Sequence, residues 1–219
     1  GFKMIINKIV LIFTLFMSIF SGNISHGEQF DKQLIAQAKS GDQDAQYELA
    51  LLYEKKDEQS PEDVKKAVYW MTQSANAGQA QAQRDLGYYY DAGEFVEQDF
   101  KKAFKYYQLA ADQNHAWAQN NLAILYHNGE GVQQSNINAL KYYRLSAAQG
   151  NGFASFNLGA MYEDGDGVDK NYKIASQYYE SAINNCDYDA EEALANLYKT
   201  GGYGLKKDLE KAKYFLSKD

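Results

Sequence analysis

Apolar side chains recur along this chain with a period of about 36 residues. Leucine and tyrosine each keep a fixed phase within that period. The leucine phase holds Leu86, Leu122, Leu158 and Leu194. The tyrosine phase holds Tyr53, Tyr90, Tyr126, Tyr162 and Tyr198. A fixed period of this length is typical of a solenoid, in which each unit buries its apolar face only against its neighbours. The pattern therefore predicts an all-α solenoid of helix–turn–helix repeats.

Each repeat is expected to contain a helix A, a turn and a helix B. Helix A is expected to begin at an alanine, namely Ala45, Ala82, Ala118, Ala154 and Ala190. Helix B is expected to begin at a residue whose side-chain oxygen can accept from free backbone N–H groups. These residues are Asp63, Asp99, Ser135, Asn171 and Asp208. In the first repeat, Ser60 and Pro61 allow a start one turn earlier.

The repeats divide the chain at regular intervals. Five of them are expected, over residues 42–78, 79–114, 115–150, 151–186 and 187–219. A helix within residues 28–41 is expected to cap the N-terminal end of the stack, because solenoids need an atypical unit there. Glycine replaces alanine in the middle of helix A at Gly87 and Gly159. Glycine costs about 1 kcal/mol relative to alanine in a helix interior, so these positions predict a close approach of helix B.

Residues 1–27 have the layout of a secretory signal peptide. Lys3 and Lys8 precede a continuous apolar run from Ile9 to Phe20, and small and polar residues follow. This run is shorter than the roughly 18 residues that a membrane span requires. The segment therefore predicts an exported protein with no stable membrane span after cleavage. An uncleaved N-terminal anchor is the alternative.

The repeat motif resembles the Sel-1-like repeat (SLR), a tetratricopeptide-type repeat. The second repeat shows it well, with Ala82, Leu86, Gly87, Tyr90, Gly93, Val96, Asp99, Lys102, Ala103, Tyr106, Tyr107, Ala110 and Ala111. The resemblance implies an α/α right-handed superhelix that serves as an adaptor for protein partners. Exported bacterial members resemble periplasmic or secreted scaffolds. One branch of the family carries a cysteine pair in each repeat, and some of its members bind penicillin. This chain has only Cys186, so that activity is not expected here.

Charge and chemistry narrow the function further. The net charge of −7 argues against a nucleic-acid partner, which requires a basic surface. His115 and His127 lack the spacing of metal ligands, and they are expected to be solvated or to cap helices. The acidic stretch 164–167 resembles part of a calcium loop, but it coincides with the repeat turn and lacks the other ligands. No nucleophile, phosphate-loop or dinucleotide motif is present. We therefore expect no enzyme activity, no cofactor and no metal.

The binding surface is expected on the outward positions of helix A, which line the concave face in tetratricopeptide-like stacks. These positions vary between repeats and carry several large apolar side chains. The candidate partner-binding residues are Tyr47, Arg84, Tyr88, Trp117, Asn120, Ile124, Phe153 and Phe156. Exposed aromatic patches with polar rims mark interaction surfaces. The alternative is that some of these side chains pack between neighbouring A helices.

Together these features predict a non-enzymatic, exported scaffold that binds a protein or peptide partner. The alternative is an envelope-polymer binding factor, which would stack peptidoglycan or polysaccharide sugars on the same aromatic side chains.

Overall fold

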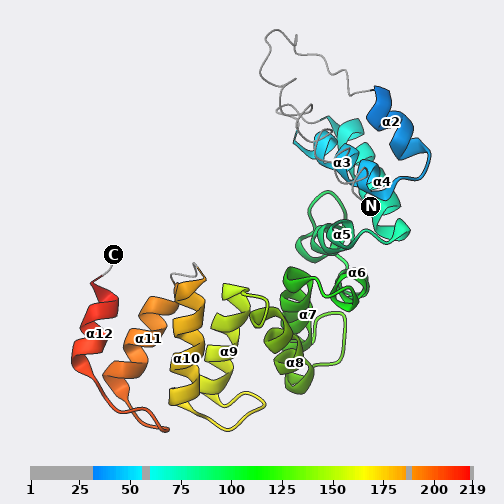
Figure 1. The fold of residues 1–219 in the computed structure, drawn as a ribbon. Coiled ribbons are helices and arrows are strands. Elements are labelled where there is room, and N and C mark those ends of the chain that lie inside the picture. Colours follow the sequence, from blue (N-terminus) through cyan, green and yellow to red (C-terminus); the bar gives the residue numbers. More distant parts are fainter. Residues whose placement is uncertain (1–31, 56–59, 186–188, 218–219) are drawn as a thin grey trace, which may run out of the picture.

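A computed structural model describes residues 32–55, 60–185 and 189–217, and these residues form a curved stack of α-helices (Figure 1). The N-terminal helices are α2 (Lys32–Lys39), α3 (Gln43–Glu54), α4 (Pro61–Ala77), α5 (Ala80–Ala92) and α6 (Phe100–Asp112). The central and C-terminal helices are α7 (Ala116–Asn128), α8 (Asn136–Ala147), α9 (Gly152–Asp164), α10 (Tyr172–Asn184), α11 (Asp189–Thr200) and α12 (Leu209–Leu216). The expected signal peptide over residues 1–27 and Cys186 lie outside the described residues.

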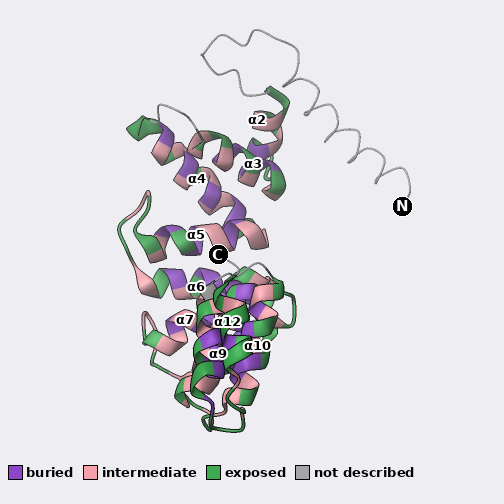
Figure 2. Ribbon diagram, turned by 90° about the vertical axis from the view of Figure 1, so that its left-hand side faces the viewer, coloured by how far each residue is buried: buried purple, intermediate pink, exposed green. Residues whose placement is uncertain are grey.

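The helices alternate between two layers. The A helices are α3, α5, α7, α9 and α11, and the B helices are α4, α6, α8, α10 and α12. Each helix packs mainly against the helix before it and the helix after it. Buried residues therefore follow the whole length of the stack instead of gathering in one centre, as Figure 2 shows. The all-α solenoid predicted from the sequence is confirmed. In the described part of the chain, no helix is both long and apolar enough to cross a lipid bilayer.

The B helices begin as the sequence predicts. Asp99, Ser135, Asn171 and Asp208 are the N-cap residues of α6, α8, α10 and α12. In α4 the earlier start is the one observed, with Ser60 as N-cap and Pro61 as the first helical residue. The Asp63 side chain accepts a hydrogen bond from the Ser60 backbone N–H at 3.1 Å, and the Asp63 N–H donates to the Ser60 hydroxyl at 3.2 Å. This reciprocal capping box satisfies two otherwise free donors.

The A helices begin earlier than expected, which corrects the prediction. The first residues of α3, α5, α7 and α9 lie two positions before the alanine series. Their N-caps are Asp42, Gln79, His115 and Asn151, and each side chain accepts from the backbone N–H of the repeat alanine. That alanine is therefore the third residue of the helix. Asp42 and Asn151 are preferred N-cap residues, but glutamine and histidine are not, so the start does not recur as a clear signal from repeat to repeat.

Close packing between the layers explains the two unusual glycines. A Cβ atom built on Gly87 would lie 2.6 Å from Tyr107 Cδ1, and one built on Gly159 would lie 2.5 Å from Tyr179 Cε1. These distances are too short for any side chain, so glycine is required where the tyrosine ring of helix B crosses helix A. The expectation of a close approach is confirmed.

The periodic tyrosine of helix A stacks on an aromatic ring of helix B in the same repeat. The ring pairs, with their centroid separations, are Tyr90–Tyr106 at 6.0 Å, Tyr126–Tyr142 at 5.8 Å, Tyr162–Tyr178 at 5.7 Å and Tyr198–Phe215 at 6.2 Å. The planes are within 15° of parallel in all four pairs. Each pair adds to the free energy of burial and fixes the angle between the two helices.

Buried glutamines join one repeat to the next. The side-chain amides of Gln46, Gln83 and Gln119 donate to the carbonyls of Ala38, Ala75 and Ala111, at 3.0, 3.0 and 3.4 Å. Each acceptor belongs to the last turn of the preceding helix and also accepts a backbone N–H from the residue three positions later. The glutamine therefore adds a second hydrogen bond to that carbonyl and joins the two helices, while its own buried amide N–H group gains an acceptor.

Candidate functional site

One face of each A helix lies along the stack, and its side chains differ in exposure. We define the A face by the repeat positions of Trp117, Asn120, Asn121 and Ile124 and their equivalents in α3, α5, α9 and α11. Hydrogen bonds join neighbouring A helices along it. They run from Tyr47 Oη to Asp85 Oδ2 at 2.7 Å, between Gln81 Oε1 and His115 Nε2 at 2.7 Å, and from Asn157 Nδ2 to Asn120 Oδ1 at 3.4 Å. The A face therefore extends across repeats.

Two aromatic rings stand exposed at the centre of the A face. Trp117 is 48% exposed and Phe153 is 52% exposed. Both are the second residue of their helix, and both follow an N-cap that fixes the first turn. Their ring centroids lie 5.5 Å apart at an interplanar angle of 49°. A pair of large apolar side chains left in water and already in contact is the kind of surface that another molecule can bury.

The other candidate residues are less exposed than this pair. Tyr88 is exposed, whereas Ile124 and Phe156 are half-buried. The Phe156 ring lies 5.4 Å from the Tyr179 ring, between centroids, and packs on the core of the last repeats. Tyr47 and Arg84 are half-buried and both engage Asp85. Phe156 and Tyr47 therefore contribute to contacts between helices and are only partly available to a ligand.

Asn120 was expected at an outward position, and the structure corrects this expectation. Its side chain is buried and only 4% exposed. It donates to Asn121 Oδ1 at 3.3 Å and accepts from Asn157 Nδ2 at 3.4 Å. These contacts, together with the neighbouring helix α9, cover the amide. Asn121 and Asn157 are the half-buried amides that lie nearer the surface.

Charged and titratable groups concentrate at the N-terminal part of the A face. Arg84 Nη1 and Asp85 Oδ1 are 2.8 Å apart, and Arg84 Nε is buried without a hydrogen-bond partner. Nearby, Tyr89 donates to Glu54 Oε2 at 3.0 Å, which ties α5 to α3. Burial raises the pKa of Glu54, although the hydrogen bond from Tyr89 opposes that shift.

Sequence reasoning missed His115 and Asp85 as parts of this surface. His115 Nδ1 accepts from the Ala118 N–H at 3.3 Å, and His115 Nε2 lies 2.7 Å from Gln81 Oε1. Burial lowers the pKa of His115, which favours the neutral ring that this cap requires. The expected capping role of His115 is confirmed. Asp85 gave no signal in the sequence, because its partner Tyr47 lies in the preceding repeat.

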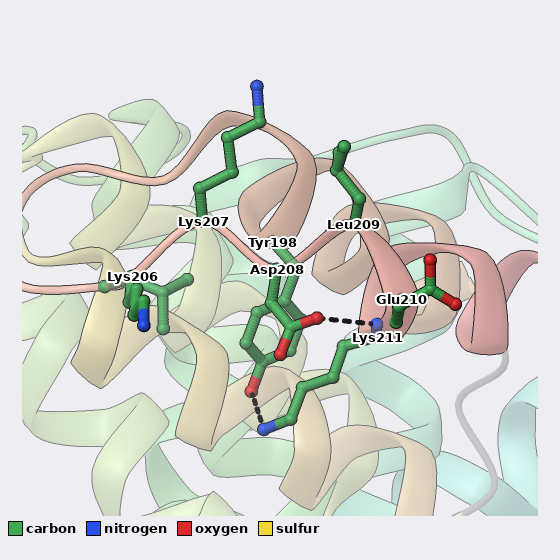
Figure 3. Close-up of a pocket in the computed structure, with 8 residues that line it drawn as sticks. Tyr198, Lys206, Lys207, Asp208, Leu209, Glu210 and Lys211 are labelled. Atoms are coloured by element: carbon green, nitrogen blue, oxygen red, sulfur yellow. Dashed lines mark hydrogen bonds between the residues drawn. The ribbon is translucent and has the colours of Figure 1, made fainter.

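A recess lies beside the turn of the last repeat (Figure 3). It has a volume of about 750 Å³ and is lined by Tyr198 and residues 205–211. Lys211 Nζ lies 3.4 Å from the Tyr198 hydroxyl and 4.8 Å from the centroid of its ring. An equivalent recess of about 390 Å³ lies beside Tyr126 in the third repeat. Both recesses occupy the turn between helices A and B, so we assign them to the geometry of that turn.

The acidic turn over residues 164–167 is part of the fold. Asp166 Oδ2 lies 2.9 Å from His127 Nε2, and Asp166 Oδ1 accepts from Asn136 Nδ2 at 3.2 Å. Gly165 and Gly167 have φ angles of 80° and 69°, as the turn requires. These contacts support the assignment to a repeat turn. In the described residues, no three His, Cys, Asp or Glu side chains gather in a way that could hold a metal ion.

Solved structures include several proteins that resemble this chain. A protective antigen present in uropathogenic Escherichia coli strains, which displays an SLR fold, is 30% identical with a TM-score of 0.79. The match covers 86% of this chain and 40% of that one, so this chain spans less than half of its length. A Sel1 repeat protein from Oxalobacter formigenes is 29% identical with a TM-score of 0.72, covering 84% of this chain and 72% of that one.

A putative sel1 repeat protein from Klebsiella pneumoniae shares the fold at 22% identity and a TM-score of 0.54, with 84% of this chain and 89% of that one covered. A comparison with curated proteins gives no match. The family model for the Sel1 repeat matches residues 43–79, 80–115, 118–151, 152–185 and 189–218. These matches cover most of the sequence and follow the helix pairs of the structure. The chain therefore belongs to the Sel1 repeat family.

Proposed function

We propose that this chain is an exported, non-enzymatic scaffold that binds a protein partner on the A face. Sel1 repeat proteins generally mediate protein–protein interactions, and the family and its structural neighbours are repeat scaffolds. The exposed contact between Trp117 and Phe153 is the observation that carries the proposal. The two rings lie on different repeats, so the surface that they form depends on the correct stacking of α7 against α9.

The chemistry of the surrounding A face fits a protein segment. Tyr88 adds a third exposed aromatic ring from the neighbouring repeat. Asn121 and Asn157 place amides beside the aromatic pair, and an amide offers a donor and an acceptor as a peptide bond does. Buried aromatic anchors inside a polar rim are the usual arrangement of binding hot spots.

Capture experiments with two matched double variants test this proposal. Trp117→Ala/Phe153→Ala removes the aromatic pair of the A face. Leu109→Ala/Leu145→Ala removes two side chains of the B helices that are similarly exposed, at 39% and 42%. We expect the first variant to lose its partner from the envelope fraction of the source cell and the second to retain it. Hot-spot residues contribute about 2 kcal/mol or more each, so the loss should be at least tenfold. Equal capture by the two variants contradicts the proposal.

The same experiment separates a protein partner from an envelope polymer. Aromatic rings also stack on sugars, so purified peptidoglycan and secreted polysaccharide are tested with the same variants. We expect capture to disappear after the envelope fraction is treated with protease. Capture that survives protease and is lost with the Trp117→Ala/Phe153→Ala variant supports the alternative function.

Export is proposed from the pattern of residues 1–27. Two lysines precede the apolar run Ile9–Phe20, and small residues follow it. Cell fractionation and N-terminal sequencing of the expressed protein test this part separately. We expect the protein outside the cytoplasm with an N-terminus near Glu28. A protein in the membrane fraction that retains residues 1–27 supports the uncleaved anchor instead.

A further inference from the structure

The A face has a neutral centre and acidic ends. Its centre, on α7 and α9, carries aromatic, aliphatic and amide side chains and no charged group at the A-face positions. At the N-terminal end, α3 contributes the exposed carboxylates of Asp44 and Glu48. At the C-terminal end, α11 contributes the exposed carboxylate of Glu192. A ligand that lies along the stack therefore meets negative charge on both sides of the aromatic pair.

The charges within the helices are divided between the two layers in the same sense. As the structure bounds them, the five A helices contain ten carboxylate and two cationic side chains, a net charge of −8. The five B helices contain five carboxylate and ten cationic side chains, a net charge of +5. Such a division orients an approaching charged molecule, because a cation is attracted to one layer and repelled by the other.

The cation on the A face does not offset this charge. Among the described A-face side chains the cationic one is Arg84, which forms an ion pair with Asp85 at 2.8 Å. Asp85 also accepts the hydrogen bond of Tyr47, so both carboxylate oxygens face donors of the protein. The pair is locally neutral. The exposed carboxylates of α3 and α11 therefore set the sign of the surface that a ligand meets.

We propose that the A face binds an extended protein segment with an aromatic or aliphatic centre and cationic residues on both sides. This inference rests on the proposed function and specifies the chemistry of its partner. The centre of the segment covers Trp117 and Phe153, whose exposed rings gain the free energy of apolar burial. The flanking lysine or arginine side chains lie near Asp44, Glu48 and Glu192, which set the register and speed the encounter.

Selection from a random peptide library tests this inference without a known partner. Dodecamers displayed on phage are selected on the full chain after depletion on the Trp117→Ala/Phe153→Ala protein. We expect the enriched peptides to carry a net positive charge and an apolar central residue. Binding of the best peptide is then followed by Trp117 fluorescence in a Trp70→Phe background, which leaves a single tryptophan on the A face.

Two triple variants with the same change in net charge distinguish an effect of the A-face carboxylates from an effect of the total charge. Asp44→Asn/Glu48→Gln/Glu192→Gln neutralises the ends of the A face. Glu97→Gln/Asp112→Asn/Glu210→Gln neutralises three exposed carboxylates of a turn and of the B helices. We expect the first variant to weaken the selected peptide by about fivefold to tenfold and to reduce its salt dependence, since exposed ion pairs are individually weak and screened. We expect the second variant to bind like the parent protein.

The outcomes distinguish this inference from the proposed function. Enrichment of neutral or acidic peptides that depends on Trp117 and Phe153 overturns the charge inference and leaves the proposed function intact. Equal effects of the two triple variants also overturn it, because they assign the attraction to the total charge. Failure to enrich any peptide above the Trp117→Ala/Phe153→Ala protein overturns this inference. If the chain then retains soluble polysaccharide, the proposed function is contradicted as well.

Discussion

At the scale of single residues, equivalent repeat positions hold different side chains with different consequences. The N-caps of α5, α7 and α9 are Gln79, His115 and Asn151, and all three accept from the N–H of the repeat alanine. Only the histidine is titratable near neutral pH. Its Nδ1 must remain unprotonated to accept from Ala118, and its Nε2 then donates to Gln81. The hydrogen bond that caps α7 therefore depends on the protonation state of the His115 ring.

We predict that His115 makes the stack less stable in mild acid. Burial lowers the pKa of His115 below its ordinary value of 6.5, so the unfolded chain binds the proton more readily. The stability is fully present above pH 6.5 and is lost as the pH falls from 6.5 towards the lowered folded pKa. The His115→Asn variant should therefore lose part of the decrease in unfolding free energy between about pH 7.5 and pH 5.

Urea denaturation at the two pH values measures this effect. The Gln79→Asn variant is the control, because it changes an equivalent cap that does not titrate. Its dependence on pH should match that of the parent protein. An unchanged pH dependence in the His115→Asn variant contradicts the assignment.

At the scale of the helices, each A helix packs on its B helix through a few positions that do not tolerate change. In the second and fourth repeats, one helix B tyrosine stacks on the helix A tyrosine, and the next tyrosine of helix B lies against Gly87 or Gly159. Other A helices carry alanine where α9 has Gly159. The helix B side chain that lies against this position therefore comes closest to the helix A backbone in the two repeats with glycine, although the repeat motif is the same.

We predict that Gly159→Leu strongly destabilises the array. The Tyr179 ring already lies where a Cβ atom would be, at 2.5 Å from Cε1 and 2.6 Å from Cδ1. Tyr179 is 1% exposed and donates to Glu163 Oε2 at 2.7 Å, so it has little freedom to move. Overpacking of this kind costs about 1–3 kcal/mol and sometimes more, which should lower the thermal midpoint by several degrees.

The next residue provides the matched control. Ala160 is half-buried on the A face, where Tyr88 and Ile124 occupy the equivalent positions. Ala160→Leu should melt close to the parent protein. A thermal melt of Gly159→Leu that is unchanged within error would contradict the packing explanation.

At the scale of the whole molecule, buried residues of the described chain are distributed along the stack, and α12 buries fewer of them than α7. Six residues of α7 are buried, whereas in α12 the buried residue is Ala212. Leu209, Tyr214 and Leu216 of α12 are about half exposed. Stability in such a protein is close to a sum over repeats and their interfaces. A helix with one neighbour is held less firmly than a helix between two.

We predict a gradient of hydrogen exchange along the stack. Amides of α12 should exchange faster than amides of α7, because α12 packs on α11 and buries one residue, whereas α7 packs on both α6 and α8 and buries six. Exchange followed by mass spectrometry of peptic fragments gives this comparison on the intact chain. Equal protection of α7 and α12 indicates that the whole array opens as one cooperative unit, contrary to this prediction.

Periodicity made most of the fold predictable and little of the candidate site. The caps of the B helices and the need for Gly87 and Gly159 were visible because they recur in phase or break a local preference. The candidate residues were chosen by helical phase alone, and phase does not report contacts with the neighbouring repeat. Helical phase therefore misplaced Asn120 at the surface, whereas in the structure Asn157 of α9 covers it. The hydrogen bonds of Asp85 with Tyr47 and of His115 with Gln81 escaped notice because these partners are 38 and 34 residues away.

The sequence by itself determined the helix pair, its repetition and the family, because each depends on local caps and on apolar residues at fixed intervals. It also determined which positions vary between repeats. Only the tertiary structure decided which of those positions reach the surface, since the stacking of one repeat on the next buries Asn120 and Phe156 to different degrees. Stacking also brings Trp117 and Phe153 together. The shared surface of two repeats exists only after both have packed, so it cannot be read from either one.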